Sequence, residues 1–259
     1  MENADKQPVT GSEALLKALA AEGVDTIFGY PGGQIMPVYD RLYDYADRLR
    51  HILVRHEQGA IHAAQGYARV TGKPGVVIVT SGPGATNVIT GVADAMTDST
   101  PVVVISGQVA SAALGTDAFQ EADIIGLTGP ITKWNYQIRR AEDVAWAVSR
   151  AFYIASTGRP GPVVLDFTKD AQVGLTDFEF RKCSFIRSYV PELPVPMEEV
   201  ARAAELIDKA ERPMVVYGQG VILGGAEKAL AEFIEKGDIP AASTLLGLAA
   251  LPSSSRLYQ

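Results

Sequence analysis

The fold is decided by the stretch Gly75-Val76-Val77-Ile78-Val79-Thr80-Ser81-Gly82-Pro83-Gly84-Ala85-Thr86-Asn87, in which a short apolar run leads into a glycine-rich turn. Residues 75–80 are β-branched and almost continuously apolar, which is typical of a strand covered on both faces. Residues 85–97 then have the spacing of a helix. A strand, a turn and a helix in this order indicate part of a βαβ unit, whose strands are parallel.

The same pattern recurs on both sides of this stretch. Further strands are predicted at residues 24–28, 51–54, 101–105 and 163–166. Further helices are predicted at residues 11–22, 35–46, 57–71 and 141–156, the first of them opened by the capping box Thr10-Gly11-Ser12-Glu13. The alternation predicts an α/β fold with a doubly wound parallel sheet.

The alternation is interrupted between residues 175 and 196, where three prolines and scattered polar residues predict a linker. A second alternation follows, with helices at 197–210 and 225–236 and strands at 213–217 and 239–243. We therefore expect a first domain over residues 1–174 and the start of a second α/β domain over 197–259. Two strands and two helices are a small core for an independent domain, so we expect the sequence to be a truncated piece.

Composition excludes several classes of protein. The 259 residues carry 23 Lys and Arg against 30 Asp and Glu, and a net charge of −7 argues against nucleic acid or anionic membrane as the main partner. The single cysteine, Cys183, excludes a disulfide framework and a cysteine metal cage, and it fits a reducing compartment. Without an apolar run long enough to span a membrane or the basic start of a signal peptide, we expect a soluble, cytoplasmic protein.

The loops after the predicted strands are the places where chemistry is expected, because ligands of open α/β sheets bind at the carboxyl ends of the strands. Three of these loops, at residues 29–33, 81–87 and 106–108, contain glycine. Glu57 is the lone carboxylate among them, at a switch from strand to helix. On spacing alone, Glu57 reads more readily as a helix-N-terminal glutamate that complements the helix dipole. The loop at 82–87 lacks the Lys and Ser/Thr of a P-loop and does not read Gly-x-Gly-x-x-Gly, so dinucleotide binding there is only weakly indicated.

Seven motifs follow one another along the chain. They are Tyr30-Pro31-Gly32-Gly33, Arg55-His56-Glu57-Gln58-Gly59-Ala60, Gly66-Tyr67-Ala68-Arg69, Thr80-Ser81-Gly82-Pro83-Gly84-Ala85-Thr86-Asn87, Gly115-Thr116-Asp117-Ala118-Phe119-Gln120-Glu121, Thr132-Lys133-Trp134-Asn135 and Gly158-Arg159-Pro160-Gly161-Pro162. Together they resemble the large, catalytic subunit of acetolactate synthase (acetohydroxyacid synthase), a thiamine-diphosphate enzyme. The resemblance runs from about residue 9 to the end of the chain.

The resemblance implies a pyrimidine-binding domain over residues 1–174 and the beginning of a central, FAD-contacting domain over 197–259. It implies a transferase that decarboxylates pyruvate and joins the product to pyruvate or 2-ketobutyrate, in the biosynthesis of valine, leucine and isoleucine. The family's Mg²⁺ and diphosphate ligands lie in a further domain with a Gly-Asp-Gly element, which this sequence lacks, so we expect no metal ligand here. A homodimer or tetramer and a small regulatory subunit are the implied partners.

Glu57 acquires a chemical role from the resemblance. Thiamine diphosphate reacts at its C2 carbon, and the cofactor's own 4′-amino group removes the C2 proton. That group is basic enough only as the imino tautomer, which forms when the ring nitrogen N1′ is protonated. An acid in an apolar site must therefore stand beside N1′, and the resemblance assigns Glu57 to it. Phe119 and Gln120 are the other implied catalytic residues, on a loop expected to close over the site. The implied thiamine-diphosphate contacts are Tyr30, Pro31, Gly32, Gly33, Glu57, Pro83, Asn87 and Gln120.

A structural flavin is implied as a second cofactor. Its expected contacts are Arg159, Arg187, Gly218, Gln219, Gly220, Thr244 and Leu245. This chain departs from the family pattern at two positions. It has Gln34 where the family commonly has alanine, and Ala110 where the family commonly has proline. Both border the substrate channel, which leaves substrate preference open but not the carboligase assignment.

Other interpretations remain open at this stage. The chain could belong to another thiamine-diphosphate decarboxylase, oxidase or carboligase, or to a non-catalytic nucleotide-binding relative. The mostly small residues along one side of the helix at 57–71 (Ala60, Ala63, Ala64, Tyr67 and Ala68) fit an intrachain core or an exposed dimer contact about equally well, and the family architecture favours the contact.

Overall fold

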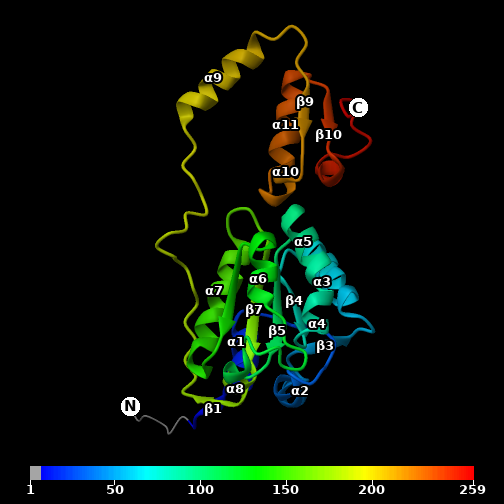
Figure 1. Ribbon diagram of the computed structural model, residues 1–259. Helices are drawn as coiled ribbons and strands as arrows, with labels where there is room; N and C mark the ends of the chain where they lie inside the picture. Colours follow the sequence, from blue (N-terminus) through cyan, green and yellow to red (C-terminus); the bar gives the residue numbers. More distant parts are fainter. Residues whose placement is uncertain (1–6) are drawn as a thin grey trace. The chain divides into compact units, whose positions relative to one another are not determined.

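The computed structural model describes residues 7–259. They form two compact units, of which the first ends at Glu192 and the second comprises Leu193–Gln259. The first unit contains a six-stranded sheet in which every neighbouring pair is parallel. Its order is β3 (Arg50–Leu53), β2 (Thr26–Gly29), β4 (Gly75–Val79), β5 (Val102–Gln108), β7 (Pro162–Thr168) and β6 (Trp134–Ile138). The predicted doubly wound parallel sheet is confirmed (Figure 1).

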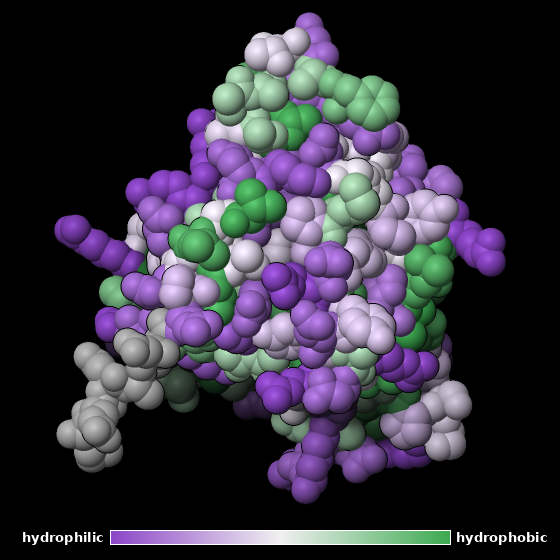
Figure 2. All heavy atoms as spheres, turned by 90° about the horizontal axis from the view of Figure 1, so that it is seen from below, coloured by the Kyte–Doolittle hydropathy of each residue, from purple (hydrophilic) through white to green (hydrophobic). Residues whose placement is uncertain are grey.

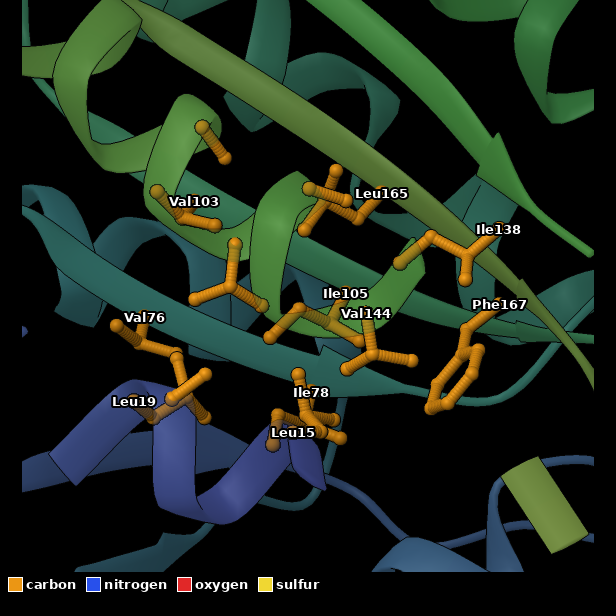
Figure 3. Packing of buried hydrophobic residues seen from close by; sticks show 14 of the residues in the cluster. Leu15, Leu19, Val76, Ile78, Val103, Ile105, Ile138, Val144, Leu165 and Phe167 are labelled. Carbon is orange, nitrogen blue, oxygen red and sulfur yellow. The ribbon is translucent and has the colours of Figure 1, made fainter. Parts of the chain in front are cut away.

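Helices cover both faces of this sheet. One face packs against α1 (Gly11–Ala21), α2 (Met36–Leu42), α7 (Val144–Ser156) and α8 (Lys169–Val173). The other packs against α3 (Glu57–Thr71), α4 (Pro83–Asn87), α5 (Ile89–Thr97) and α6 (Ile124–Thr128). Successive residues of β4 therefore serve different cores. Val76 and Ile78 join Leu15 and Leu19 of α1 (Figure 3), whereas Val77 faces α3. The continuous apolar run at 75–79 follows from burial on both faces.

Several elements differ from the prediction. The strand β6 was not expected, because the alternating polar and aromatic residues of 134–138 lack an apolar run. They stand on an edge strand, where most of them are only half-buried. The helix predicted over 85–97 is divided at Val88 into α4 and α5. The short antiparallel pair of β1 (Val9–Thr10) and β8 (Leu175–Thr176) was also not expected. Short 3-10 turns, η1 (Tyr43–Tyr45), η2 (Ser111–Ala113), η3 (Gly129–Ile131) and η4 (Ala141–Asp143), complete the unit.

Three alanines of α3 face their own sheet. Ala60 and Ala64 are fully buried in the same cluster as Val77 and Val104, and Ala68 is almost fully buried. A Cβ atom on Gly75 of β4 would collide with the carbonyl oxygen of Ala64, so helix and strand approach closely. The expectation of an exposed dimer contact is therefore wrong for Ala60, Ala64 and Ala68, and for the partly exposed Ala63 and Tyr67 it stays a prediction. The small size of the three buried alanines lets α3 pack against β4 within the chain.

Much of the segment expected to be a linker packs against the first unit. Ile186 is buried in the core, and Phe178, Phe180, Cys183 and Tyr189 lie against it. The hydroxyl of Tyr189 donates to the carbonyl of Thr157 at 2.6 Å, which fixes this segment after α7.

The second unit contains the predicted helices and strands in the predicted order, together with α10 (Gly220–Leu223) and η5 (Leu245–Ala250), which were not expected. The predicted elements are α9 (Met197–Asp208), β9 (Val215–Tyr217), α11 (Glu227–Gly237) and β10 (Ala241–Ser243). Strands β9 and β10 are parallel. Their core is small and contains Tyr217, Ile234, Ala241 and Leu257. Over residues 7–259, no helix has both the length and the apolar character that crossing a membrane requires. Many hydrophilic side chains, with apolar ones among them, cover the face shown in Figure 2.

Candidate functional site

The strand order places a switch point between β2 and β4. From β2 the chain continues to β3 on one side, and from β4 it continues to β5 on the other side, so the two connections lead in opposite directions from neighbouring strands. Such a point at the carboxyl ends of parallel strands is where open α/β sheets bind ligands. The loops that meet there are the glycine-containing ones after Gly29 and Val79, and Glu57 follows the neighbouring strand β3.

Thr80 holds the two glycine-containing loops together. Its hydroxyl oxygen accepts a hydrogen bond from the backbone N–H of Gln34 at 3.2 Å. A Cβ atom at Gly32 would lie 2.6 Å from the side chain of Thr80, and one at Gly84 would lie 2.8 Å from it. Both distances are shorter than van der Waals contact, so the approach of the loops requires glycine on both sides of Thr80.

Glu57 is the first residue of α3, and its side chain is only 8% exposed. The amide nitrogen Nδ2 of Asn87 donates to its Oε2 at 2.9 Å. Its Oε1 would lie 3.4 Å from a Cβ atom on Gly84. The preceding residue, His56, caps the helix by accepting from the N–H of Gln58 at 3.1 Å. A glutamate that only complements a helix dipole needs neither burial nor a side-chain amide partner, and Glu57 has both.

The loop between β5 and α6 reaches the same place. Gln120 has a left-handed backbone (φ +61°), and its carbonyl oxygen would lie 2.5 Å from a Cβ atom on Gly82. The carboxylate of Glu121 accepts hydrogen bonds from the N–H groups of Gly115 and Ala118, which closes the loop on itself. The Gly115 bond is the main cause that lowers the pKa of Glu121. Phe119, in contrast, is 83% exposed.

The structure thus brings together four of the residues expected to contact thiamine diphosphate. Gly32, Glu57, Asn87 and Gln120 are linked through Thr80, Gly82 and Gly84. The other four of that set, Tyr30, Pro31, Gly33 and Pro83, lie exposed on the same two loops.

The residues expected to contact FAD belong to both units. Arg159 and Arg187 are in the first, where the guanidinium of Arg159 donates to the Ser99 hydroxyl at 2.7 Å and to the Thr97 carbonyl at 3.0 Å. Arg187 is exposed. The remainder, Gly218, Gln219, Gly220, Thr244 and Leu245, lie in the second unit at the ends of β9 and β10. There a Cβ atom on Gly218 would lie 3.2 Å from the hydroxyl oxygen of Thr244.

Sequence reasoning missed a buried polar cluster around Asp166. This side chain is fully buried on β7, and it accepts hydrogen bonds from the Ser106 hydroxyl at 2.9 Å and from the amides of Gln108 at 3.1 Å and Gln137 at 2.8 Å. Burial is the main cause that raises the pKa of Asp166 to about 6, and the negative charge of Asp123 contributes to it. The signal in the sequence was a carboxylate inside the apolar run Val163-Val164-Leu165-Asp166-Phe167.

This raised pKa predicts a pH-dependent stability. The folded chain binds the proton of Asp166 more tightly than the unfolded chain, where an aspartate titrates near pH 4. The free energy of unfolding should therefore fall as the pH rises from about 4 to about 7, by up to about 3 kcal/mol. Asp166→Asn should remove this pH dependence, because an amide does not titrate in this range. The fold should remain, since the amide oxygen can accept from both glutamines while the NH₂ group faces Ser106. Urea unfolding at pH 4.5 and 8 measures the pH dependence. A variant with the same pH dependence as the parent would contradict this assignment.

Among residues 7–259, no group of three or more His, Cys, Asp or Glu side chains lies close enough together to bind a metal ion.

Comparisons with known proteins agree with this geometry. Residues 9–127 match the family model of the thiamine pyrophosphate enzyme N-terminal TPP binding domain, and residues 200–259 match that of the central domain. An acetolactate synthase of Mycobacterium bovis is 49% identical over 250 residues, which is 96% of this chain and 40% of that protein.

Two further relatives are similar to the same extent. The acetolactate synthase large subunit of Corynebacterium glutamicum is 46% identical over 99% of the chain and 41% of its own length. The acetolactate synthase isozyme 2 large subunit of Escherichia coli is 47% identical over 96% of the chain and 44% of its own length. The chain therefore spans about two fifths of the length of these relatives. The two matching domains and these relatives confirm the resemblance found in the sequence: the chain belongs to the thiamine pyrophosphate enzymes and is similar to acetolactate synthase large subunits over nearly its whole length.

Proposed function

We propose that this chain supplies the pyrimidine-binding half of the active site of an acetolactate synthase catalytic subunit. The proposed reaction is the decarboxylation of pyruvate, followed by carbon–carbon bond formation with a second 2-ketoacid, either pyruvate or 2-ketobutyrate. The observation that carries the proposal is the buried Glu57, hydrogen-bonded by Asn87 at the switch point of the sheet. The identity with acetolactate synthases over 96% of the chain supports the choice among thiamine-diphosphate enzymes.

The residues at this point fit an aminopyrimidine ring. Gly32, Gly82 and Gly84 carry no side chain where the loops come closest, so the loops pack tightly beside the buried carboxyl group of Glu57, which a ring nitrogen can face. When bound, thiamine diphosphate would supply a nucleophilic carbon for addition to the ketoacid carbonyl. Glu57, which is only 8% exposed, would stand beside N1′ of the ring and hold a proton there. Asn87 orients that carboxyl group through Oε2, and Gln120 offers a polar contact to the substrate.

FAD is proposed as a structural second cofactor. Gly218, Gln219, Gly220, Thr244 and Leu245 are its proposed contacts in the second unit, where two strand ends and a glycine turn come together. Arg159 already donates to Ser99 and Thr97, so it fits this role less well than the exposed Arg187. For Mg²⁺, the described residues offer no ligand group, and no step is assigned to it.

The arrangement of the whole protein is part of the proposal. Residues 1–174 are proposed as the pyrimidine-binding domain and 197–259 as part of the central domain. Assembly into a homodimer or tetramer is proposed, and several relatives named as large subunits suggest a smaller subunit as an additional partner. A cytoplasmic location stays a prediction.

A chimaera tests the function. Residues 1–259 would replace the matching part of the Corynebacterium glutamicum large subunit, and the purified chimaera would receive pyruvate, thiamine diphosphate, Mg²⁺ and FAD. We expect 2-acetolactate to form. The unmodified relative, purified in parallel, is the control. A folded chimaera that binds thiamine diphosphate but releases acetaldehyde or acetate instead would point to a decarboxylase or oxidase. A folded chimaera that fails to bind it would refute the proposed site.

A further inference from the structure

The buried cluster around Asp166 is connected to the loop that carries Phe119 and Gln120. The connection is Gln108, the last residue of β5, whose side chain is almost fully buried. Its Nε2 donates to Asp166 Oδ2 at 3.1 Å and to the backbone carbonyl of Ala122 at 3.0 Å. Ala122 lies two residues after Gln120.

The orientation of the Gln108 amide is fixed at both ends. Its Oε1 accepts the backbone N–H of Val109 at 2.9 Å, so the NH₂ group must face Asp166 and Ala122. Both protons of that group are then used, one for each acceptor. Asp166 itself is held by Ser106 and Gln137, from the strands on either side of β7. The sheet therefore presents a rigid donor to a loop that is otherwise irregular.

We infer that Gln108 is a positioning residue, which fixes the loop of residues 110–122 to the sheet through the Ala122 carbonyl and so places Gln120 against Gly82. Ser111 attaches the start of the loop to Asp170 and Thr168, whereas the hydrogen bonds from Gly115 and Ala118 to Glu121 only close the loop on itself. The Ser111 bonds do not determine where the other end of the loop, with Gln120, lies on the sheet, and Gln108 attaches that end. The left-handed backbone of Gln120 costs energy for a residue other than glycine, and the attachments on its two sides, at Ser111 and Ala122, maintain it. The catalytic consequence rests on the proposed function, whereas the attachment of the loop does not.

Hydrogen exchange of the 259-residue chain tests the inference without any cofactor or substrate. Gln108→Met keeps the length of the side chain and removes its donors and acceptor. We expect the amides of Gly115, Ala118 and Glu121 to exchange about tenfold faster, the scale of one lost hydrogen bond. The amides of β2, far along the sheet, should keep the exchange of the parent. If Gln108→Met fails to fold, Gln108→Asn is the second variant, because it stays polar but is one carbon too short to reach both acceptors.

Gln137→Met is the matched control. It removes the other amide that donates to Asp166 Oδ2, from β6, but no hydrogen bond joins Gln137 to the loop among the described residues. We expect its loop amides to exchange within about twofold of the parent. Unchanged loop exchange in the Gln108 variant would overturn the inference. Equal acceleration in both variants would also overturn it, since the loop would then respond to the loss of any bond to Asp166. Neither outcome affects the proposed reaction, which the chimaera tests separately.

Discussion

In the chimaera, Glu57→Gln is expected to slow the exchange of the C2 hydrogen of bound thiamine diphosphate by ~10²-fold or more, the scale for removal of a positioned proton donor. Glutamine has nearly the shape of glutamate, and its amide oxygen still accepts from Asn87, so the fold should remain intact. The amide lacks the acidic proton that N1′ requires. The exchange rate, followed by NMR in D₂O, measures this step directly, before any ketoacid binds.

Glu13→Gln is the control for the alternative role of Glu57. Glu13 also lies in the first turn of a helix, α1, where its N–H is capped by Thr10. If Glu57 acted only on the helix dipole, both variants would lose about 0.3–1 kcal/mol of stability and neither would change C2 exchange. If C2 exchange in Glu57→Gln were as fast as in the parent, the catalytic assignment would be refuted. Slower C2 exchange in Glu57→Gln but not in Glu13→Gln would support it.

The fold could be predicted where burial imposes a simple pattern. Strands β4, β5 and β7 are covered on both faces, and their continuous apolar runs are visible in the sequence. The edge strand β6 was missed because its half-exposed residues need no such run. Likewise, the segment around Ile186 reads as polar and proline-rich, yet a few apolar residues suffice to attach it to the core.

The site could be predicted only as far as chain order allows. The glycine motifs and Glu57 are visible as local signals at strand ends, and the resemblance added Asn87 and Gln120. The contacts that join them are not local, because Glu57 and Asn87 are 30 residues apart and Gln108 and Asp166 are 58 apart. Thr80 illustrates the difficulty. Its side chain packs between two loops and holds them together, but threonine after an apolar strand carries no distinctive signal.

The small residues of α3 show why a pattern alone misled. Alanines at helical spacing indicate a close approach but not the partner, and here the partner is β4 of the same chain. The competing interpretations differ sharply for one substitution. A dimer contact predicts that a charged side chain separates subunits that remain folded, whereas a core position predicts that the chain itself unfolds.

Ala64→Arg is expected to destabilise the fold by at least about 3–5 kcal/mol, the cost of an unpaired charge in an apolar core. Ala64 is fully buried among Ile61, Val77 and Val104, and its carbonyl lies against Gly75, so a guanidinium has neither space nor a partner there. Val70→Arg is the matched control on the same helix, because Val70 is 86% exposed and its replacement should change stability by less than about 0.5 kcal/mol. Urea unfolding followed by circular dichroism compares the two variants. If Ala64→Arg kept the parental midpoint and only its sedimentation changed, α3 would be a contact between subunits after all.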